Sequence, residues 1–173
     1  MPSISVIIST YNKPHFLEKV LTGYSFQTFK DFEIIIADDG SSNETKEMIE
    51  KFERIISQEI YHVWHEDSGF RKCKILNTAI KKSSNDYLVF SDGDCIPNSR
   101  FLETHSKLAK KGCFLSGGHF PINEKVSNLL LIEDIKSQTC FTKKYLIKKG
   151  QPIGKNYFKP VSYTHLRAHE TLS

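Results

Sequence analysis

Two carboxylates flank a glycine at Asp92-Gly93-Asp94, directly after the apolar segment 87–90. Carboxylates at this spacing can share one divalent cation, while the glycine lets the backbone approach a diphosphate closely. Mg²⁺ and Mn²⁺ are bound in this way, through few carboxylates together with substrate phosphate oxygens. A solvated Asp-Gly turn without chemistry is the alternative interpretation. The triplet by itself leaves both open.

Further clusters of polar, turn-forming residues also follow predicted strands, namely Thr10-Tyr11-Asn12, Asp38-Asp39-Gly40-Ser41 and residues 65–71. In open α/β sheets ligands bind at the carboxyl ends of the strands, so clusters that share this edge predict a binding site. Taken singly, DDGS is equally typical of a strand-to-helix turn with an N-cap. Arg71 offers a fork of donors that matches phosphate oxygens, against the alternative of a surface arginine at a helix start.

The elements that must position these residues alternate between strand and helix. Residues 4–9 and 32–37 are apolar runs rich in β-branched side chains, typical of strands buried on both faces of a parallel sheet. Between them apolar residues recur at helical spacing after Pro14. Further segments continue the pattern: helix 41–56, strand 60–64, a helix around 75–80, strand 87–90, helix 97–111 and strand 113–115. The alternation predicts an α/β fold with a mainly parallel, doubly wound sheet.

Composition narrows the class of protein. The 173 residues, 39% of them hydrophobic, suffice for one compact domain, and a net charge of +4 falls short of a nucleic-acid-binding signature. The four cysteines have no CxxC or zinc-site spacing, which predicts free thiols in a reducing compartment. Neither a signal sequence nor an apolar run of membrane-spanning length is visible. We therefore expect a cytoplasmic protein without a nucleic-acid partner.

Four segments in order resemble family 2 glycosyltransferases of the GT-A fold: VIISTYN, QTFKDFEIIIADDGS, HEDSGFRKCKILNTAI and DYLVFSDGDCIP. The resemblance covers residues 3–118 and implies a GT-A (Rossmann-like) layered sandwich. It implies transfer of a sugar, with inversion, from a nucleotide-diphosphate donor to an acceptor hydroxyl. A UDP-linked donor, a glycan or lipid-linked acceptor and a role in cell-surface glycan or lipopolysaccharide synthesis are expected. Peripheral association with the inner face of the membrane is a further hypothesis.

The resemblance also implies which side chains would contact the nucleotide-sugar: Thr10, Tyr11, Asn12, Asp39, Arg71 and Asp92. The first three would line the nucleoside pocket, and Asp39 would hydrogen-bond the base or the ribose. Arg71 would meet the diphosphate. Asp92 and Asp94 would form the DxD motif that binds Mn²⁺ or Mg²⁺, with Asp94 as the more direct ligand.

The C-terminal part carries no recognisable general base. Glu133-Asp134 lies in an amphipathic stretch without the expected glycine and tryptophan context, and His119 beside glycines is more typical of a structural residue. Residues 161–173 resemble a translated sequencing-adapter artefact, and we assign no function to the histidines at positions 165 and 169 within it. The sequence thus predicts a nucleotide-sugar-binding domain at 1–160, incomplete at its C-terminus where the base is expected, and a non-native tail.

Two hypotheses from other classes stay open. The chain could hold nucleotide and metal without turnover, as a catalytically incomplete fragment. It could instead be an interaction protein that contacts acidic partners or membranes through Lys143, Lys144, Lys148 and Lys149. A nucleotidyltransferase or a dinucleotide-dependent oxidoreductase would need a glycine-rich phosphate loop after the first strand, which the sequence lacks.

Overall fold

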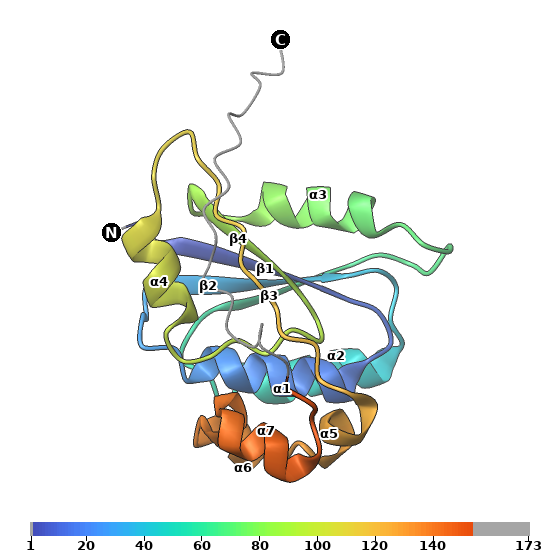
Figure 1. Ribbon diagram of the computed structural model, residues 1–173. Helices are drawn as coiled ribbons and strands as arrows, with labels where there is room; N and C mark the ends of the chain where they lie inside the picture. The colour runs from blue at the N-terminus through green and yellow to red at the C-terminus, as the bar shows by residue number, and fades with distance from the viewer. Residues whose placement is uncertain (1, 154–173) are drawn as a thin grey trace. The chain divides into compact units, whose positions relative to one another are not determined.

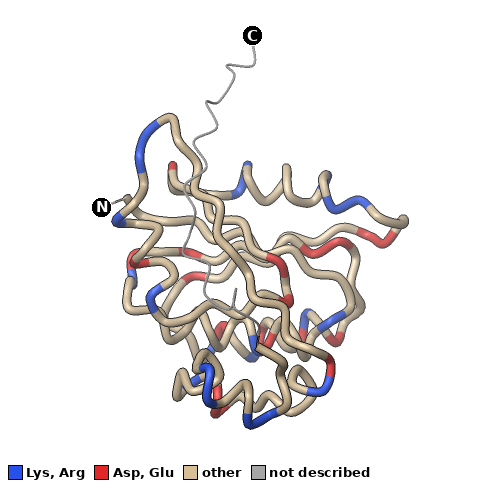
Figure 2. Tube along the Cα trace, viewed as in Figure 1, with Lys and Arg blue, Asp and Glu red and all other residues tan. Residues whose placement is uncertain are grey.

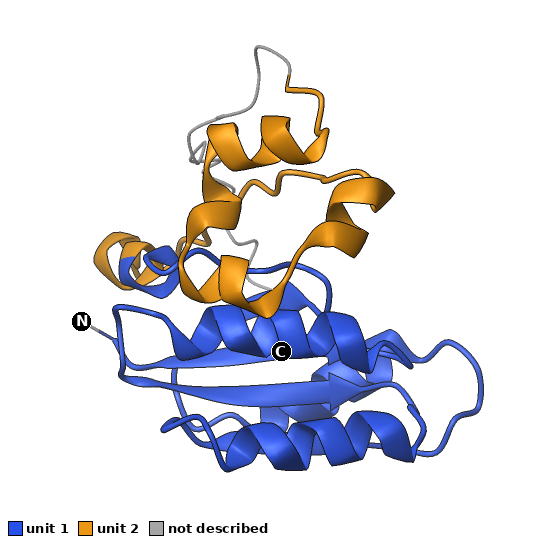
Figure 3. Cartoon of the chain, turned by 90° about the horizontal axis from the view of Figure 1, so that it is seen from below, with its two compact units in different colours: residues 1–103 blue, residues 104–173 orange. Residues whose placement is uncertain are grey.

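The computed structural model describes residues 2–153. The chain divides into two compact units, residues 1–103 and residues 104–173 (Figure 3). The predicted non-native tail at 161–173, with its two histidines, lies outside the described residues.

The first unit contains a four-stranded parallel sheet with the strand order β3-β2-β1-β4 (Figure 1). Its strands are β1 (Ile4–Thr10), β2 (Phe32–Asp38), β3 (Ile60–Trp64) and β4 (Tyr87–Asp92). In the register, Thr10 lies opposite Asp38, and Ser9 lies opposite Asp92. Asp38 in turn lies opposite Trp64. The carboxyl ends of all four strands therefore meet at one edge of the sheet.

Helices cover both faces of this sheet. On one side lie α1 (Pro14–Ser25) and α2 (Asn43–Glu53), and on the other lies α3 (Lys72–Lys82) (Figure 1). Because side chains alternate along a strand, Val6 and Ile8 pack with the α1 and α2 residues, whereas Ile7 packs with α3 residues. Both faces of β1 are thus apolar, as its continuous hydrophobic run predicts.

Residues 104–153 of the second unit contain short helices. These are α5 (Glu124–Leu129), α6 (Ile132–Lys136), the 3₁₀ helix η1 (Thr139–Phe141) and α7 (Lys143–Lys149), while α4 (Phe101–Leu108) spans the boundary between the units. The buried apolar side chains of these short helices include Val126, Ile135 and Leu146. No helix within the described residues is both long and apolar enough to cross a membrane.

The predicted alternation of strands and helices is confirmed through β4, but two segments differ. The helix predicted at 97–111 is shorter, since α4 covers only Phe101–Leu108. Residues 113–115 are not a strand, and Phe114 is half exposed. An apolar triplet becomes a strand only where a neighbouring strand offers backbone partners, and these residues pair with none among the described part of the chain. The cysteines are free, as expected, with Cys140 buried.

A buried glutamine joins the end of α1 to the start of α4. The Gln27 side chain is 1% exposed, and its Nε2 donates to the carbonyl oxygens of Gly23 (3.1 Å) and Asn98 (2.7 Å). Its Oε1 accepts from the Leu102 amide at 2.9 Å. All three bonds lie within the first unit, so this one side chain satisfies backbone groups from two elements.

We expect Gln27→Ala to lower the free energy of unfolding by about 2 kcal/mol, because buried backbone groups lose their partners. Urea denaturation measures the change. Gln58→Ala is the matched control, since the Gln58 side chain makes only exposed contacts, at 3.5 Å to the Lys30 carbonyl and at 3.2 Å from Ser57 Oγ, and its cost should stay within about 0.5 kcal/mol. Equal effects of the two substitutions would contradict this account of Gln27.

Candidate functional site

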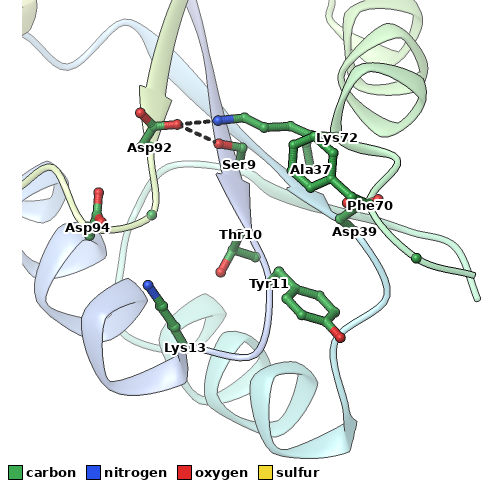
Figure 4. A pocket seen from close by; sticks show the side chains of 12 residues that line it. Ser9, Thr10, Tyr11, Lys13, Ala37, Asp39, Phe70, Lys72, Asp92 and Asp94 are labelled. Atoms are coloured by element: carbon green, nitrogen blue, oxygen red, sulfur yellow. Dashed lines mark hydrogen bonds and ion pairs between the residues drawn. The ribbon is translucent and has the colours of Figure 1, made fainter. Parts of the chain in front are cut away.

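A pocket of about 430 Å³ opens at the carboxyl edge of the sheet in the first unit (Figure 4). Among the residues singled out in the sequence, it is lined by Thr10, Tyr11, Asp39, Asp92 and Asp94. The predicted cluster 65–71 contributes Gly69 and Phe70, and lining residues that the sequence did not single out include Ser9, Lys13 and Lys72. All four predicted clusters therefore contribute residues to one cavity.

Asn12, which the sequence predicted at the nucleoside pocket, is not among the lining residues and instead joins two turns to each other. Its φ of 47° lies in the left-handed region, which asparagine tolerates better than most residues. Its backbone N–H donates to Ser41 Oγ at 2.8 Å, and its Oδ1 accepts from the Ser42 amide at 2.9 Å. Asn12 thus holds the turn after β1, which carries Tyr11, against the turn after β2, which carries Asp39.

The two aspartates of DDGS have different surroundings. Asp38 is completely buried, and its Oδ1 accepts from the Ser41 amide at 2.8 Å, as a turn-forming aspartate does. Asp39 is 6% exposed and lines the pocket. Its Oδ1 lies 2.7 Å from His65 Nε2, and its Oδ2 accepts from the Arg71 amide at 2.9 Å. The turn and pocket interpretations of the motif therefore apply to different residues.

The loop 65–71 packs against this turn. Gly40 has a φ of 98°, and a Cβ there would lie 2.6 Å from Asp67 Cα, so only glycine leaves room for the loop. Tyr11 Oη donates to Asp67 Oδ2 at 2.9 Å. This bond raises the pKa of Tyr11 and lowers the pKa of Asp67. The Tyr11 side chain, which lines the pocket, is thereby hydrogen-bonded to the loop 65–71.

The Arg71 guanidinium is turned toward its own loop. Its Nη2 donates to the Glu66 carbonyl oxygen, and its Nε is buried without a hydrogen-bond partner. Arg71 is not among the residues that line the pocket, whereas the adjacent Lys72 is. Lys72 Nζ lies 2.6 Å from Asp92 Oδ1, which also accepts from Ser9 Oγ at 2.9 Å (Figure 4). Of these two neighbouring basic residues, Lys72 rather than Arg71 therefore contacts the DxD motif.

The DxD residues fit a divalent cation that takes part of its ligands from a substrate. Asp94 lines the pocket apart from the Lys72–Asp92 pair (Figure 4). Gly93 lets this turn lie close to β1. Its amide donates to the Ser9 carbonyl oxygen at 2.8 Å, and a Cβ at this position would lie 2.8 Å from the same oxygen. Within residues 2–153, no group of three or more His, Cys, Asp or Glu could hold a metal. Mg²⁺ and Mn²⁺ often use one or two carboxylates and complete their shells with phosphates and water.

One buried polar atom beside the motif has no partner. Thr10 Oγ1 forms no hydrogen bond although Thr10 lines the pocket. Buried hydroxyl groups are normally satisfied, so an unpaired one at a pocket wall is suited to contact a ligand. Burial, followed by the charges of Asp94 and Asp92, raises the pKa of the neighbouring Cys95 thiol.

The acidic pair considered as a general base is engaged in local structure of the second unit. Asp134 Oδ2 accepts from the Leu131 amide at 3.1 Å and from Tyr145 Oη at 2.7 Å. Glu133 forms an ion pair with Lys136 at 2.8 Å. His119 is exposed in a segment without helix or strand. None of these observations identifies Glu133, Asp134 or His119 as a catalytic group.

The sequence matches the description Glycosyl transferase family 2 over residues 5–161. The chain belongs to this family. Glycosyltransferase AglE of Haloferax volcanii is 33% identical over 122 residues, which cover 69% of this chain and 40% of AglE. The GalNAc(5)-diNAcBac-PP-undecaprenol β-1,3-glucosyltransferase of Campylobacter jejuni is 30% identical over 115 residues, covering 65% of this chain and 36% of that relative. The chain thus spans less than half the length of either.

Solved glycosyltransferases share the architecture. Staphylococcus aureus TarS 1–349 in complex with UDP-GlcNAc matches with a TM-score of 0.53 and 25% identity, over 61% of this chain and 30% of that one. The mannosyltransferase PcManGT from Pyrobaculum calidifontis, in complex with GDP-Man and Mn²⁺, matches with a TM-score of 0.56 and 23% identity, over 65% and 34% of the two chains. The second likeness concerns the fold alone. The predicted GT-A class is confirmed.

Because a Cβ on Gly93 would collide with the Ser9 carbonyl, we expect Gly93→Ala to lower the free energy of unfolding by about 1–3 kcal/mol. Chemical denaturation gives this value. At Gly118 no heavy atom lies within 4 Å of an added Cβ, so Gly118→Ala should change stability by less than about 0.5 kcal/mol. A neutral Gly93→Ala would rule out the close approach of this turn to β1.

Proposed function

We propose that this chain forms the donor-binding part of a glycosyltransferase that uses a UDP-linked sugar and a divalent cation. The observation that carries the proposal is the pocket at the carboxyl edge, where Asp39, Asp92 and Asp94 share one cavity with Lys72. Membership of the family and the likeness to TarS, whose solved complex contains UDP-GlcNAc, support a nucleotide-sugar as the ligand. The transferred sugar, the acceptor and the linkage formed are properties of the whole protein, and we assign none of them to this part.

In the proposed complex, the nucleoside lies between Tyr11 and Asp39, and Thr10 Oγ1 gains a partner. The diphosphate lies beside the DxD turn, where Gly93 allows close approach and Asp94 and Asp92 hold the cation. Such a cation, Mn²⁺ or Mg²⁺, would neutralise charge that develops on the departing diphosphate. Lys72 supplies a further positive charge at the same place. The acceptor hydroxyl attacks the anomeric carbon from the opposite face, which inverts its configuration.

Transfer also needs a carboxylate within hydrogen-bond reach of the acceptor hydroxyl. We propose that it comes from outside the residues assigned above, because the contacts of Glu133 and Asp134 are local. The second possibility, a unit that binds nucleotide without turnover, differs in one measurement. Metal-dependent binding of UDP without release of sugar from any donor would favour it.

We further propose that the second unit contacts an anionic membrane surface. Residues 104–153 contain nine lysines and three carboxylates, whereas residues 1–103 have 16 carboxylates against 12 basic side chains. On α7, which is labelled in Figure 1 and has blue segments in Figure 2, Ile147 is 53% exposed. Lys143 and Lys144 precede it at helical spacing, and Lys148 follows it directly in the sequence. An exposed apolar side chain beside lysines suits the boundary between lipid headgroups and acyl chains.

Asp94→Ala should abolish the Mn²⁺-dependent part of UDP binding while leaving the fold intact, because it removes the proposed cation ligand. Calorimetric titration with UDP, with and without Mn²⁺, measures this, and ADP serves as the control for the base. Asp86→Ala removes an exposed carboxylate next to the start of β4 and should bind UDP as the unsubstituted protein does. Unchanged Mn²⁺-dependent affinity in Asp94→Ala would refute the role of Asp94.

Replacing Lys143, Lys144 and Lys148 together by Gln should weaken binding to vesicles with phosphatidylglycerol about a hundredfold, since each lysine near such a surface contributes about 1 kcal/mol. Vesicle co-sedimentation at low and high salt measures the effect. The matched control replaces Lys46, Lys51 and Lys81 of the first unit by Gln and should retain binding. Equal loss in both triple variants would show that total charge, rather than α7, determines the association.

A further inference from the structure

Two consecutive aspartates at the end of β2 are each paired with a histidine. Asp38 Oδ2 lies 2.9 Å from His62 Nε2, and Asp39 Oδ1 lies 2.7 Å from His65 Nε2. The side chains of both histidines are largely buried, at 16% and 17% exposed. The pairs thus resemble one another closely in geometry and burial.

The two pairs differ in the surroundings of the aspartate. Asp39 lines the pocket, whereas Asp38 accepts a hydrogen bond from the Ser41 amide inside the turn and does not line the pocket. His65 itself is not among the residues that line the pocket. A ligand there would touch Asp39 and leave His65 behind it. His65 can therefore influence a ligand through the carboxylate that it holds, and not by direct contact.

We propose that His65 is a positioning residue for the donor site, which fixes the Asp39 carboxylate through Nε2 in the orientation that meets the nucleoside. This inference rests on the proposed function. One Asp39 oxygen contacts His65, and the other accepts from the Arg71 amide, so rotation of the carboxylate would break both contacts. Hydrogen bonds to an ionised acceptor are among the strong ones, and a group fixed in advance loses little entropy when a ligand binds.

The same two contacts close the loop 65–71. His65 stands at one end of the loop and Arg71 at the other, and both meet Asp39. Between them, Asp67 contacts Tyr11 and packs on Gly40. Releasing His65 would free one end of the loop and leave Asp39 with one fewer partner. The backbone N–H of Arg71 reports this change directly, because its acceptor is the other oxygen of the same carboxylate.

The test uses which ring nitrogen makes the contact. The amide nitrogen of glutamine can occupy the place of Nε2, whereas that of asparagine, one carbon shorter, reaches only as far as Nδ1. We therefore expect His65→Gln to preserve the contact and His65→Asn and His65→Ala to lose it. All three substitutions remove the imidazole, so a role that needs the ring itself or its charge would be lost in all of them.

Two measurements are made on each variant. Amide hydrogen exchange at Arg71, followed by NMR without ligand, should become about tenfold faster in His65→Ala and His65→Asn and stay near that of the unsubstituted protein in His65→Gln. Calorimetry with UDP and Mn²⁺ should show about a tenfold loss of affinity in the same two variants and recovery in His65→Gln. Titration with Mn²⁺ and inorganic pyrophosphate should be unaffected, because Asp39 is assigned to the nucleoside.

His62→Ala is the matched control, because it removes the contact of the other pair, and it should leave Arg71 exchange and UDP affinity unchanged. Unaltered exchange and affinity in His65→Ala would overturn the inference, as would equal losses in all three His65 variants or an equal loss in His62→Ala. If the unsubstituted protein binds no UDP, the proposed function fails. The exchange measurement then still decides whether His65 holds Asp39, since it needs no nucleotide.

Discussion

The parallel pairing of β1 with β2 on one side and with β4 on the other is the constraint on which the rest of the first unit depends. It places Thr10 opposite Asp38 and Ser9 opposite Asp92, so the polar residues that follow each strand must gather at one edge. The apolar faces hold this register. A shift by one residue would exchange Ile7 with Val6 or Ile8 between two differently shaped cores, one against α3 and one against α1 and α2.

At that edge the loops are joined to one another rather than left to move independently. Asn12 holds the turns after β1 and β2 together, and Gly40 allows the loop 65–71 to pack on the second of these turns. Tyr11 reaches the same loop through Asp67. The walls of the pocket therefore support each other through short polar contacts between segments far apart in sequence. A site of this kind is formed before its ligand arrives, which limits the entropy lost on binding.

The sequence predicted the sheet and the edge well, because buried strands such as 4–10 and 32–38 are continuous apolar runs with polar residues at their ends. It did not predict which of the adjacent residues Arg71 and Lys72 faces the cavity. Arg71 matches a phosphate better than Lys72 by type, yet α3 begins so that Lys72 faces Asp92. The partners of Asp39 depend on where the loop 65–71 returns, which is tertiary information. The prediction of a strand at residues 113–115 was wrong, because an apolar segment forms a strand only where another strand is available to pair with it.

The ion pair between Lys72 and Asp92 has an electrostatic consequence for the pocket. Asp39 and Asp94 also line the cavity, so three carboxylates, against the two lysines Lys13 and Lys72, would repel an incoming anion. Lys72, at 2.6 Å from Asp92, cancels part of that field at the place where the repulsion would be strongest. An approaching polyanion would thus exchange partners with an existing pair, taking over the ammonium group while Asp92 is released. The cavity thus keeps a counter-charge of its own, and binding would begin by giving Lys72 a new partner.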